Sequence, residues 1–215
     1  MPKLNITPPD LRRILCFVAE AIGKEEAYLN SLDGAIGDGD HGITMRVGFE
    51  AVKAKVGALD ASVTIDGVLT ESGAAFMGAT GGAIGVLLGR MLMSAGAALQ
   101  GCKEIGTSEL RVLLNSMETA VASAGKAKPG DKTILDAVHA ANQAGTTAAE
   151  AHQSLPDMLS RASLAAQTAA QNTAGMRARV GRASRLGDRV LGHPDPGAVS
   201  FSIIMRAMAE WLEEN

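Results

Sequence analysis

Apolar residues recur at helical spacing along most of this chain, and this periodicity is the feature that most limits its fold. The first such segment follows Thr7-Pro8-Pro9-Asp10, where a threonine N-cap precedes a proline at the first helical position and an acid at the third. Its apolar residues are Leu11, Ile14, Leu15, Val18, Ala19 and Ile22. The spacing predicts one helix that delivers the chain to Asp33.

The same periodicity predicts seven further helices. They cover about 41–56, 65–77, 86–95, 110–125, 134–149, 155 onward and 204–212. Aromatic residues make up only 3% of the chain and hydrophobic residues 47%, so a core must be packed from small and aliphatic side chains. Such side chains favour closely approaching helices over a β-sandwich. With no convincing strand, linker or repeat, the sequence predicts one all-α domain of eight helices over residues 1–215.

Three carboxylates follow the first predicted helix within a glycine-rich loop. Asp33, Asp38 and Asp40 are separated by five and two residues. Carboxylates held this close repel one another unless a cation, a proton or an arginine intervenes. Oxygen ligands suit a hard ion such as Mg²⁺, which shares its ligands among carboxylates, water and phosphate. Because a helix is predicted to begin directly after the loop, and helix N-termini favour bound phosphate, the stretch indicates a magnesium and phosphate site.

Two other interpretations compete for this loop. Its Asp-Gly-Asp composition is also typical of a plain turn. An EF-hand needs a bidentate glutamate at its twelfth position, and counting Asp38 as the first places Phe49 there. Counting from Asp33 places Ala35 and Gly37 at ligand positions. The EF-hand therefore fails in both frames, and the third carboxylate favours a metal over a turn.

Two further loops carry weaker signals. Residues 78–85 are small and open a helix, as in a phosphate-cradling loop, but no Gly-Lys-Ser/Thr follows, so this is no P-loop. Glycine-rich helix contacts without a ligand explain these residues equally well. The loop 125–133 carries Lys126, Lys128 and Lys132. We expect these lysines on the solvated surface.

Five arginines lie between Arg177 and Arg189, before a stiff turn, Gly192-His193-Pro194-Asp195-Pro196-Gly197. No aromatic residue for base stacking accompanies the arginines, and the net charge is −3, which argues against nucleic-acid binding. If neighbouring helices run antiparallel, the loops 30–44, 78–85, 125–133 and 177–197 converge on one rim.

The chain shows no signal for export or for a membrane. Its first residues lack the basic and apolar regions of a signal peptide, and no apolar run reaches about 18 residues without polar interruption. We expect a cytoplasmic chain that binds neither membrane nor nucleic acid. Cys16 and Cys102 stand alone, so we expect packing residues and not a disulfide or a metal pair.

Three long signatures occur in one order along the chain. They are Leu32-Asp33-x-x-Ile36-Gly37-Asp38-x-Asp40-His41-Gly42, Gly130-Asp131-Lys132-Thr133, and Gly181-Arg182-Ala183-Ser184-x-Leu186-Gly187 with His193-x-Asp195-Pro196-Gly197. Over essentially its whole length the chain resembles the nucleotide-binding L subunits of dihydroxyacetone kinases, which also occur as the C-terminal domain of single-chain kinases. The resemblance implies an eight-helix antiparallel barrel with the nucleotide at one rim.

The resemblance also implies a set of site residues. Asp33, Asp38 and Asp40 would hold two Mg²⁺ ions that bridge the phosphates of ADP or ATP. The phosphates would be contacted by His41, Gly42, Ile43, Thr44, Ala79 and Thr80. The rest of the nucleotide site would be lined by Gly125, Ile134, Arg182, Asp195, Pro196 and Gly197. Metal ions and an arginine can neutralise the phosphate charge, so no protein nucleophile is needed and no catalytic residue is assigned.

Relatives of this kind transfer the γ-phosphoryl group of ATP to dihydroxyacetone held by a separate K subunit, so the resemblance implies that partner. Related kinases act on other small ketoses such as erythrulose, which leaves the substrate open. The phosphoryl source is also open, between free ATP and a phosphotransferase-system protein that rephosphorylates bound ADP. The alternative from another class is a non-catalytic module that senses ADP or ATP. The complete carboxylate set favours the kinase, because binding alone does not need two bridging metals.

Overall fold

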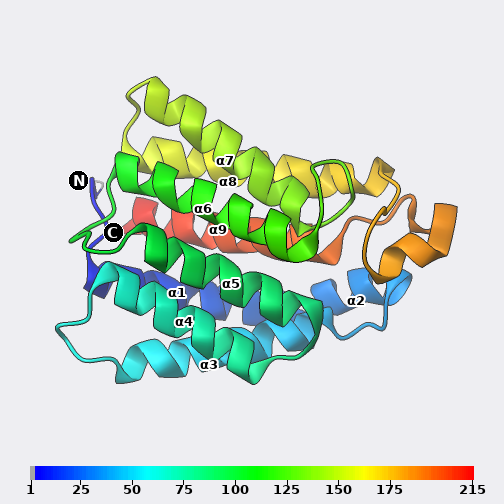
Figure 1. The fold of residues 1–215 in the computed structure, drawn as a ribbon, viewed down its shortest axis with the longest axis horizontal. Helices are drawn as coiled ribbons and strands as arrows, with labels where there is room; N and C mark the ends of the chain where they lie inside the picture. The colour runs from blue at the N-terminus through cyan, green and yellow to red at the C-terminus, as the bar shows by residue number, and fades with distance from the viewer. Residues whose placement is uncertain (1–2) are drawn as a thin grey trace.

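The computed structural model describes residues 3–215, and every regular element in this part of the chain is a helix (Figure 1). The α-helices are α1 (Pro8–Lys24), α2 (Glu26–Ile36), α3 (His41–Ala58), α4 (Ile65–Ala79), α5 (Gly82–Ala98), α6 (Thr107–Gly125), α7 (Ile134–Glu150), α8 (Leu155–Asn172) and α9 (Pro196–Glu214). Two 3₁₀ segments, η1 (Thr173–Gly175) and η2 (Arg182–Val190), connect α8 to α9. The predicted all-α class is confirmed.

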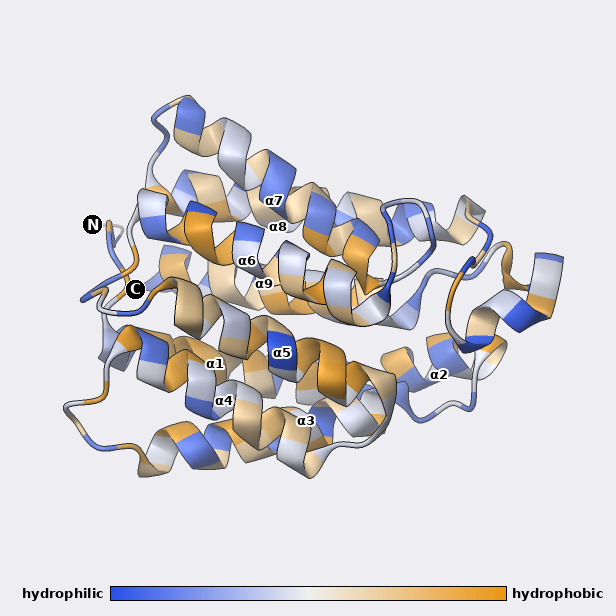
Figure 2. Cartoon of the chain, viewed as in Figure 1, coloured by the Kyte–Doolittle hydropathy of each residue, from blue (hydrophilic) through white to orange (hydrophobic). Residues whose placement is uncertain are grey.

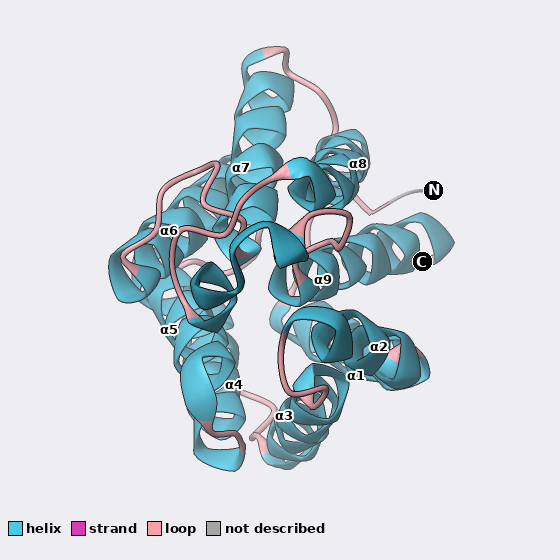
Figure 3. Cartoon of the chain, turned by 90° about the vertical axis from the view of Figure 1, so that its right-hand side faces the viewer, coloured by secondary structure: helices cyan, strands magenta, loops and turns pink. Residues whose placement is uncertain are grey.

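Eight of these helices form a closed ring. Each packs on its neighbours in the order α1, α3, α4, α5, α6, α7, α8 and α9, and α9 packs back on α1. Seen end-on, the helices surround a common axis (Figure 3). Helix α1 begins and α9 ends at the left of Figure 1, as an even number of antiparallel helices requires. The predicted eight-helix antiparallel barrel is confirmed, and α2 is an additional helix that projects beyond the opposite end.

The expected single helix up to Asp33 is wrong, because the chain breaks at Glu25 into α1 and α2. The backbone N–H of Glu25 donates to the carbonyls of Ile22 and Gly23 and so leaves the α-helical pattern. Arg206 of α9 then pairs with the Glu25 carboxylate at 3.1 Å. This contact links the start of α2, the helix that carries the first carboxylate of the loop, to α9.

The other predicted helices are present with small shifts of their ends. Helix α3 begins within the predicted window and α5 begins at Gly82, ahead of the expected start at 86. The arginine segment was not predicted to be helical, yet η2 covers most of it. Gly187 interrupts η2 with a left-handed φ of 60°, a conformation that glycine adopts without steric cost. Local turns of this kind carry no apolar periodicity, so the sequence pattern does not reveal them.

Glycines let the helices of the ring approach closely. Each helix carries both hydrophilic and hydrophobic residues (Figure 2), and the buried hydrophobic side chains form one core. Between α3 and α4, a Cβ added to Gly48 would lie 2.3 Å from the ring of the buried Phe76. Between α4 and α5, a Cβ on Gly73 would lie 2.6 Å from the carbonyl oxygen of Gly89. Because aromatic side chains are scarce and glycines lie at these contacts, the backbones of neighbouring helices nearly touch.

Both cysteines of the chain, Cys16 and Cys102, are free thiols and pack against the apolar core. The prediction that they form no disulfide is confirmed. Among residues 3–215, none of the helices is long and apolar enough to cross a lipid bilayer.

The α4–α5 contact gives a stability prediction. Gly73→Ala should destabilise the protein by about 1–3 kcal/mol, because the new methyl group meets backbone atoms that cannot move aside easily. For a chain of this size that lowers the melting temperature by roughly 2–4 °C per kcal/mol. Gly57→Ala is the matched control, since nothing lies within 4 Å of a Cβ at this exposed helical glycine. Calorimetry should show an unchanged or raised melting temperature for the control; equal melting of Gly73→Ala and wild type would contradict the packing argument.

Candidate functional site

The three predicted carboxylates lie together at the end of the barrel to which α2 projects. Asp33 is on the last turn of α2, and Asp38 and Asp40 are in the loop that leads into α3. One ligand oxygen from each lies within 4.8 Å of the other two. Asp38 and Asp40 are exposed, and Asp33 is partly buried. The loop therefore presents a compact set of oxygen donors to the solvent.

Backbone bonds to Asp33 give the loop its shape. Its Oδ2 accepts hydrogen bonds from the N–H groups of Gly39 at 2.8 Å and Asp40 at 3.1 Å. Gly39 has a φ of 79°, which favours glycine. A Cβ on Gly37 would lie 2.4 Å from Asp33 Oδ1, so only glycine fits beside that carboxylate. Asp33 thus folds the loop that places Asp38 and Asp40 beside it.

A cation from a distant segment partly balances these charges. Arg182, in η2, forms a hydrogen-bonded ion pair with Asp38 through its Nη1. This bond lowers the pKa of Asp38 below its usual value. Burial, followed by the negative charges of Asp38 and Asp33, raises the pKa of Asp40. One arginine therefore leaves the cluster short of positive charge, as a site for a hard divalent cation requires.

The N-terminus of α3 opens beside the carboxylates. The side chain of Asp40, the N-cap residue, makes no capping hydrogen bond. The N–H of Ile43 donates to Asn30 Oδ1 at 3.1 Å, and that of Thr44 to the Asp40 carbonyl at 2.9 Å. Gly42 allows this close approach of α3 to α2, because a Cβ there would lie 2.1 Å from a carbonyl oxygen of α2. Asn30 therefore satisfies one first-turn N–H group of α3, and the N-cap side chain of Asp40 satisfies none.

His41 does not offer its imidazole to that site. The side chain is buried, and Nε2 lies 3.1 Å from Ser200 Oγ on α9. Burial lowers the pKa of His41 to about 4, so the ring is neutral near pH 7. The residue joins α3 to α9, and only its backbone is available on the loop side.

The loop between α4 and α5 lies at the same end of the barrel. Ala79 is exposed at the end of α4, while the Thr80 hydroxyl donates to the Phe76 carbonyl at 2.7 Å. Helix α5 begins after Gly81 without a side-chain cap. A second helix N-terminus is therefore uncapped at this end, in contrast to α1, α4, α7, α8 and α9, which side chains cap.

The remaining predicted residues gather around the starts of α7 and α9. Asp195 caps α9 by accepting from the Ala198 N–H at 2.8 Å, and burial raises the pKa of its carboxyl to about 7. A Cβ on Gly197 would lie 3.3 Å from Ile134 Cβ, so the two segments are in contact. Ile134 itself is only 3% exposed and offers little open apolar surface. Pro196 is also buried.

Gly125 ends α6, at the same end of the barrel as the other loops. A Cβ there would lie 3.5 Å from Leu87, which is on α5 just beyond the small-residue loop. The four loops predicted to converge do lie at one end, which faces the viewer in Figure 3.

One residue of this region was placed wrongly by sequence reasoning. Lys132 was expected on the solvated surface, but it is only 2% exposed. Its ammonium group donates to the backbone carbonyls of Thr173 and His193. A single lysine in a polar loop carries no periodic signal of burial; the only available sign was its place within the Gly130-Asp131-Lys132-Thr133 signature.

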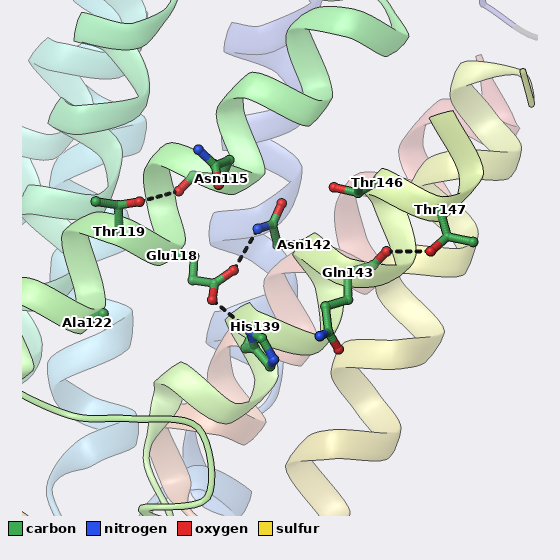
Figure 4. Close-up of a pocket in the computed structure, with 9 residues that line it drawn as sticks. All are labelled: Asn115, Glu118, Thr119, Ala122, His139, Asn142, Gln143, Thr146 and Thr147. Atoms are coloured by element: carbon green, nitrogen blue, oxygen red, sulfur yellow. Dashed lines mark hydrogen bonds and ion pairs between the residues drawn. The ribbon is translucent and has the colours of Figure 1, made fainter. Parts of the chain in front are cut away.

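A polar groove of about 790 Å³ lies elsewhere, on the outer face between α6 and α7 (Figure 4). At its floor the Glu118 carboxylate binds His139 Nδ1 at 2.7 Å and the Asn142 amide at 2.6 Å. The hydroxyls of Thr119 and Thr147 bond to carbonyls of their own helices. Only the Glu118 bonds therefore join the two helices, and the groove is not part of the carboxylate site.

Comparison with known proteins matches this geometry to one family. The model of the DAK2 domain matches residues 35–210. The ADP-binding subunit DhaL of the PEP-dependent dihydroxyacetone kinase of Escherichia coli (strain K12) is 40% identical over 185 residues, which are 86% of this chain and 88% of that protein. The L-erythrulose 1-kinase of Mycolicibacterium smegmatis is 37% identical over 87% of this chain and 33% of its own length.

A solved structure agrees in fold. The crystal structure of the dihydroxyacetone kinase from C. freundii in complex with AMP-PNP and Mg²⁺ superposes with a TM-score of 0.72 and 26% identity. The match covers 98% of this chain, which spans 34% of that kinase chain. By sequence over most of its length and by fold, this chain belongs to the DAK2 domain family, and its relatives named here are kinases or kinase subunits.

Proposed function

We propose that this chain is the nucleotide- and magnesium-binding subunit of a dihydroxyacetone kinase, with residues 1–215 acting as one L-type domain. The observation that carries the proposal is the cluster of Asp33, Asp38 and Asp40, whose ligand atoms lie within 4.8 Å beside the uncapped start of α3. Three carboxylate oxygens with no thiolate among them match the ligands that Mg²⁺ prefers. The relatives named as an ADP-binding subunit and as a complex with AMP-PNP and Mg²⁺ support this assignment.

Different residues at this end of the barrel would bind the metal ions and the phosphates of the nucleotide. Asp33, Asp38 and Asp40 would ligate two magnesium ions. Bound Mg²⁺ would supply positive charge against the phosphate oxygens. The N–H groups of His41 and Gly42 at the start of α3, and the start of α5 after Ala79 and Thr80, would donate to phosphate. Ile43 and Thr44, whose N–H groups bond to Asn30 and to the Asp40 carbonyl, would lie beside it.

Arg182 and the distal loops complete the site. Arg182 already pairs with Asp38, so its guanidinium can turn to a phosphate once other positive charge occupies the cluster. The turn Asp195-Pro196-Gly197, with Gly125 and the first residue of α7, Ile134, would line the rest of the nucleotide site.

The small ketose would be bound on a second polypeptide. Phosphoryl transfer to a ketose requires the acceptor hydroxyl to be held in line, which calls for a dedicated pocket. A histidine that attacks the carbonyl could hold the ketose covalently. Of the four histidines, His41 is buried against α9, and His139 is hydrogen-bonded to Glu118 in the α6–α7 groove. His152 lies in the turn after α7, and His193 lies in the stiff turn before α9, where its carbonyl accepts from Lys132. We therefore assign the ketose to a separate K subunit docked over the rim. Dihydroxyacetone is the proposed substrate, and the erythrulose kinase among the relatives makes a four-carbon ketose the comparison to assay.

The name of the E. coli relative, an ADP-binding subunit of a PEP-dependent kinase, supports a phosphoenolpyruvate-linked phosphoryl donor over free ATP. We propose that ADP stays bound here and is rephosphorylated by a phosphotransferase-system protein. Turnover with a phosphoenolpyruvate-linked donor but not with free ATP would support this; turnover with free ATP alone would refute it.

The carboxylate cluster gives a binding prediction. Asp38→Asn and Asp40→Asn should each weaken binding of Mg-ADP by about tenfold or more, which corresponds to about 1.4 kcal/mol. The helix content measured by circular dichroism should not change, because these side chains are exposed. Isothermal titration is the measurement. Asp60→Asn, in the exposed loop at the far end of α3, is the matched control and should bind as wild type does. Wild-type affinity in both rim variants would exclude the metal assignment.

The two-chain arrangement gives an activity prediction. The purified chain with Mg-nucleotide and dihydroxyacetone should form no product above background, because the ketose is assigned to the K subunit. Addition of a cognate K subunit, with the phosphoryl donor, should give turnover, followed as dihydroxyacetone phosphate formed. Product from the isolated chain would show that the ketose site is on these residues. A chain that binds Mg-ADP but supports no transfer with any K subunit or donor would instead be the ADP or ATP sensor.

A further inference from the structure

Lys132 is the most deeply buried cation of the rim. It precedes α7, in the loop 125–133, and is only 2% exposed. Its backbone φ of 61° is left-handed, which is unfavourable for a residue with a side chain. Its Nζ donates to the carbonyl of Thr173, at the end of α8, and to the carbonyl of His193, before α9. One ammonium group therefore joins three segments that are far apart in the sequence.

Thr173 makes further hydrogen bonds at this junction, where the loop 125–133, the end of α8 and the chain before α9 meet. Its side chain is fully buried, and its hydroxyl donates to the Ala170 carbonyl while it accepts from the N–H of Asp195 at 2.8 Å. The N–H of Gly192 donates to the Ala174 carbonyl at 2.9 Å. The chain that leads into α9 is thus held on the end of α8 at both 192 and 195, with the lysine bond to residue 193 between them.

Charge complements this arrangement. The Lys132 ammonium lies at the C-terminal end of α8, where a helix favours a cation. Burial lowers the pKa of Lys132, and the negative charges of Asp195 and Asp136 oppose that shift. Asp136 is itself fixed by accepting from the N–H groups of Gly130 and Thr133. The charges that face this lysine are those at the starts of α7 and α9, whereas the loop carboxylates face Arg182.

The junction bears directly on one half of the proposed nucleotide site. It fixes Asp195, and the chain then continues into Gly197, which contacts Ile134 two residues beyond the lysine. With only 2% of its surface exposed, the lysine has almost nothing with which to touch a ligand. It can act only through the backbone that it holds.

We propose that Lys132 is a positioning residue that holds the turn before α9 against the start of α7 and so shapes the part of the site that receives the nucleoside of ADP. This inference rests on the proposed function and adds a residue to it. The carboxylate loop and the start of α3 do not depend on Lys132, because hydrogen bonds to Asp33 and Asn30 hold them. Loss of the lysine should therefore impair one half of the nucleotide and spare the other.

The test compares two ligands on the full chain. Lys132→Met keeps an unbranched apolar side chain and removes the ammonium group; Lys128→Met, at an exposed lysine of the same loop, is the matched control. Isothermal titration with Mg-ADP should show affinity lowered by about tenfold or more in Lys132→Met, because the turn before α9 would no longer be held in place before the ligand binds. Titration with magnesium and inorganic pyrophosphate, which lacks the nucleoside, should give wild-type affinity. The control should bind both ligands as wild type does.

The outcomes separate the two proposals. Wild-type affinity of Lys132→Met for Mg-ADP, or an equal loss for Mg-ADP and pyrophosphate, overturns the positioning role. Failure of the wild-type chain itself to bind Mg-ADP would count against the proposed function instead. If Lys132→Met melts below the assay temperature, Thr173→Val decides, because it removes one hydroxyl from the same junction. It must then show the selective loss of Mg-ADP binding, and equal binding of Mg-ADP by Thr173→Val and wild type overturns the inference.

Discussion

Repulsion among three carboxylates is the interaction on which the rim of this protein depends. Asp33, Asp38 and Asp40 lie with ligand atoms within 4.8 Å of one another, and the fold holds them there through backbone N–H groups that bond to Asp33. Positive charge must then come from elsewhere. Arg182 supplies part of it and, by doing so, ties the η2 segment to a loop 144 residues away in sequence. The same shortage of charge makes a divalent cation the natural occupant.

Arg182 and Lys132, the two cations discussed at this end of the barrel, differ in exposure and in their partners. Arg182 is exposed and pairs with an exposed carboxylate, so its bond contributes little to stability and can be exchanged for a ligand. Lys132 is buried and bonded to two carbonyls, so removal of its charge would leave those groups without a partner. One cation is free to respond to a bound phosphate, and the other fixes the frame around it.

Features that depend on neighbouring residues could be predicted from the sequence, whereas those set by distant segments could not. Apolar spacing and the Thr7 cap predicted helices that are present, because both signals act within one or two turns of chain. The break at Glu25 was missed, since it is fixed in part by Arg206 from the far end of the sequence. Lys132 was misplaced for the same kind of reason: its partners lie 41 and 61 residues away.

By itself the sequence determined the all-α class, the carboxylate loop and the resemblance that leads to a kinase. Spacing along one chain is enough for these, because helices and metal-ligand motifs are local patterns. Only the tertiary structure decided that α2 is a separate helix outside the ring of eight, that the His41 imidazole packs on α9, and that Ile134 is covered. The position of α2 and the burial of these two residues depend on which segments pack together across the barrel, and spacing along the chain does not specify that packing.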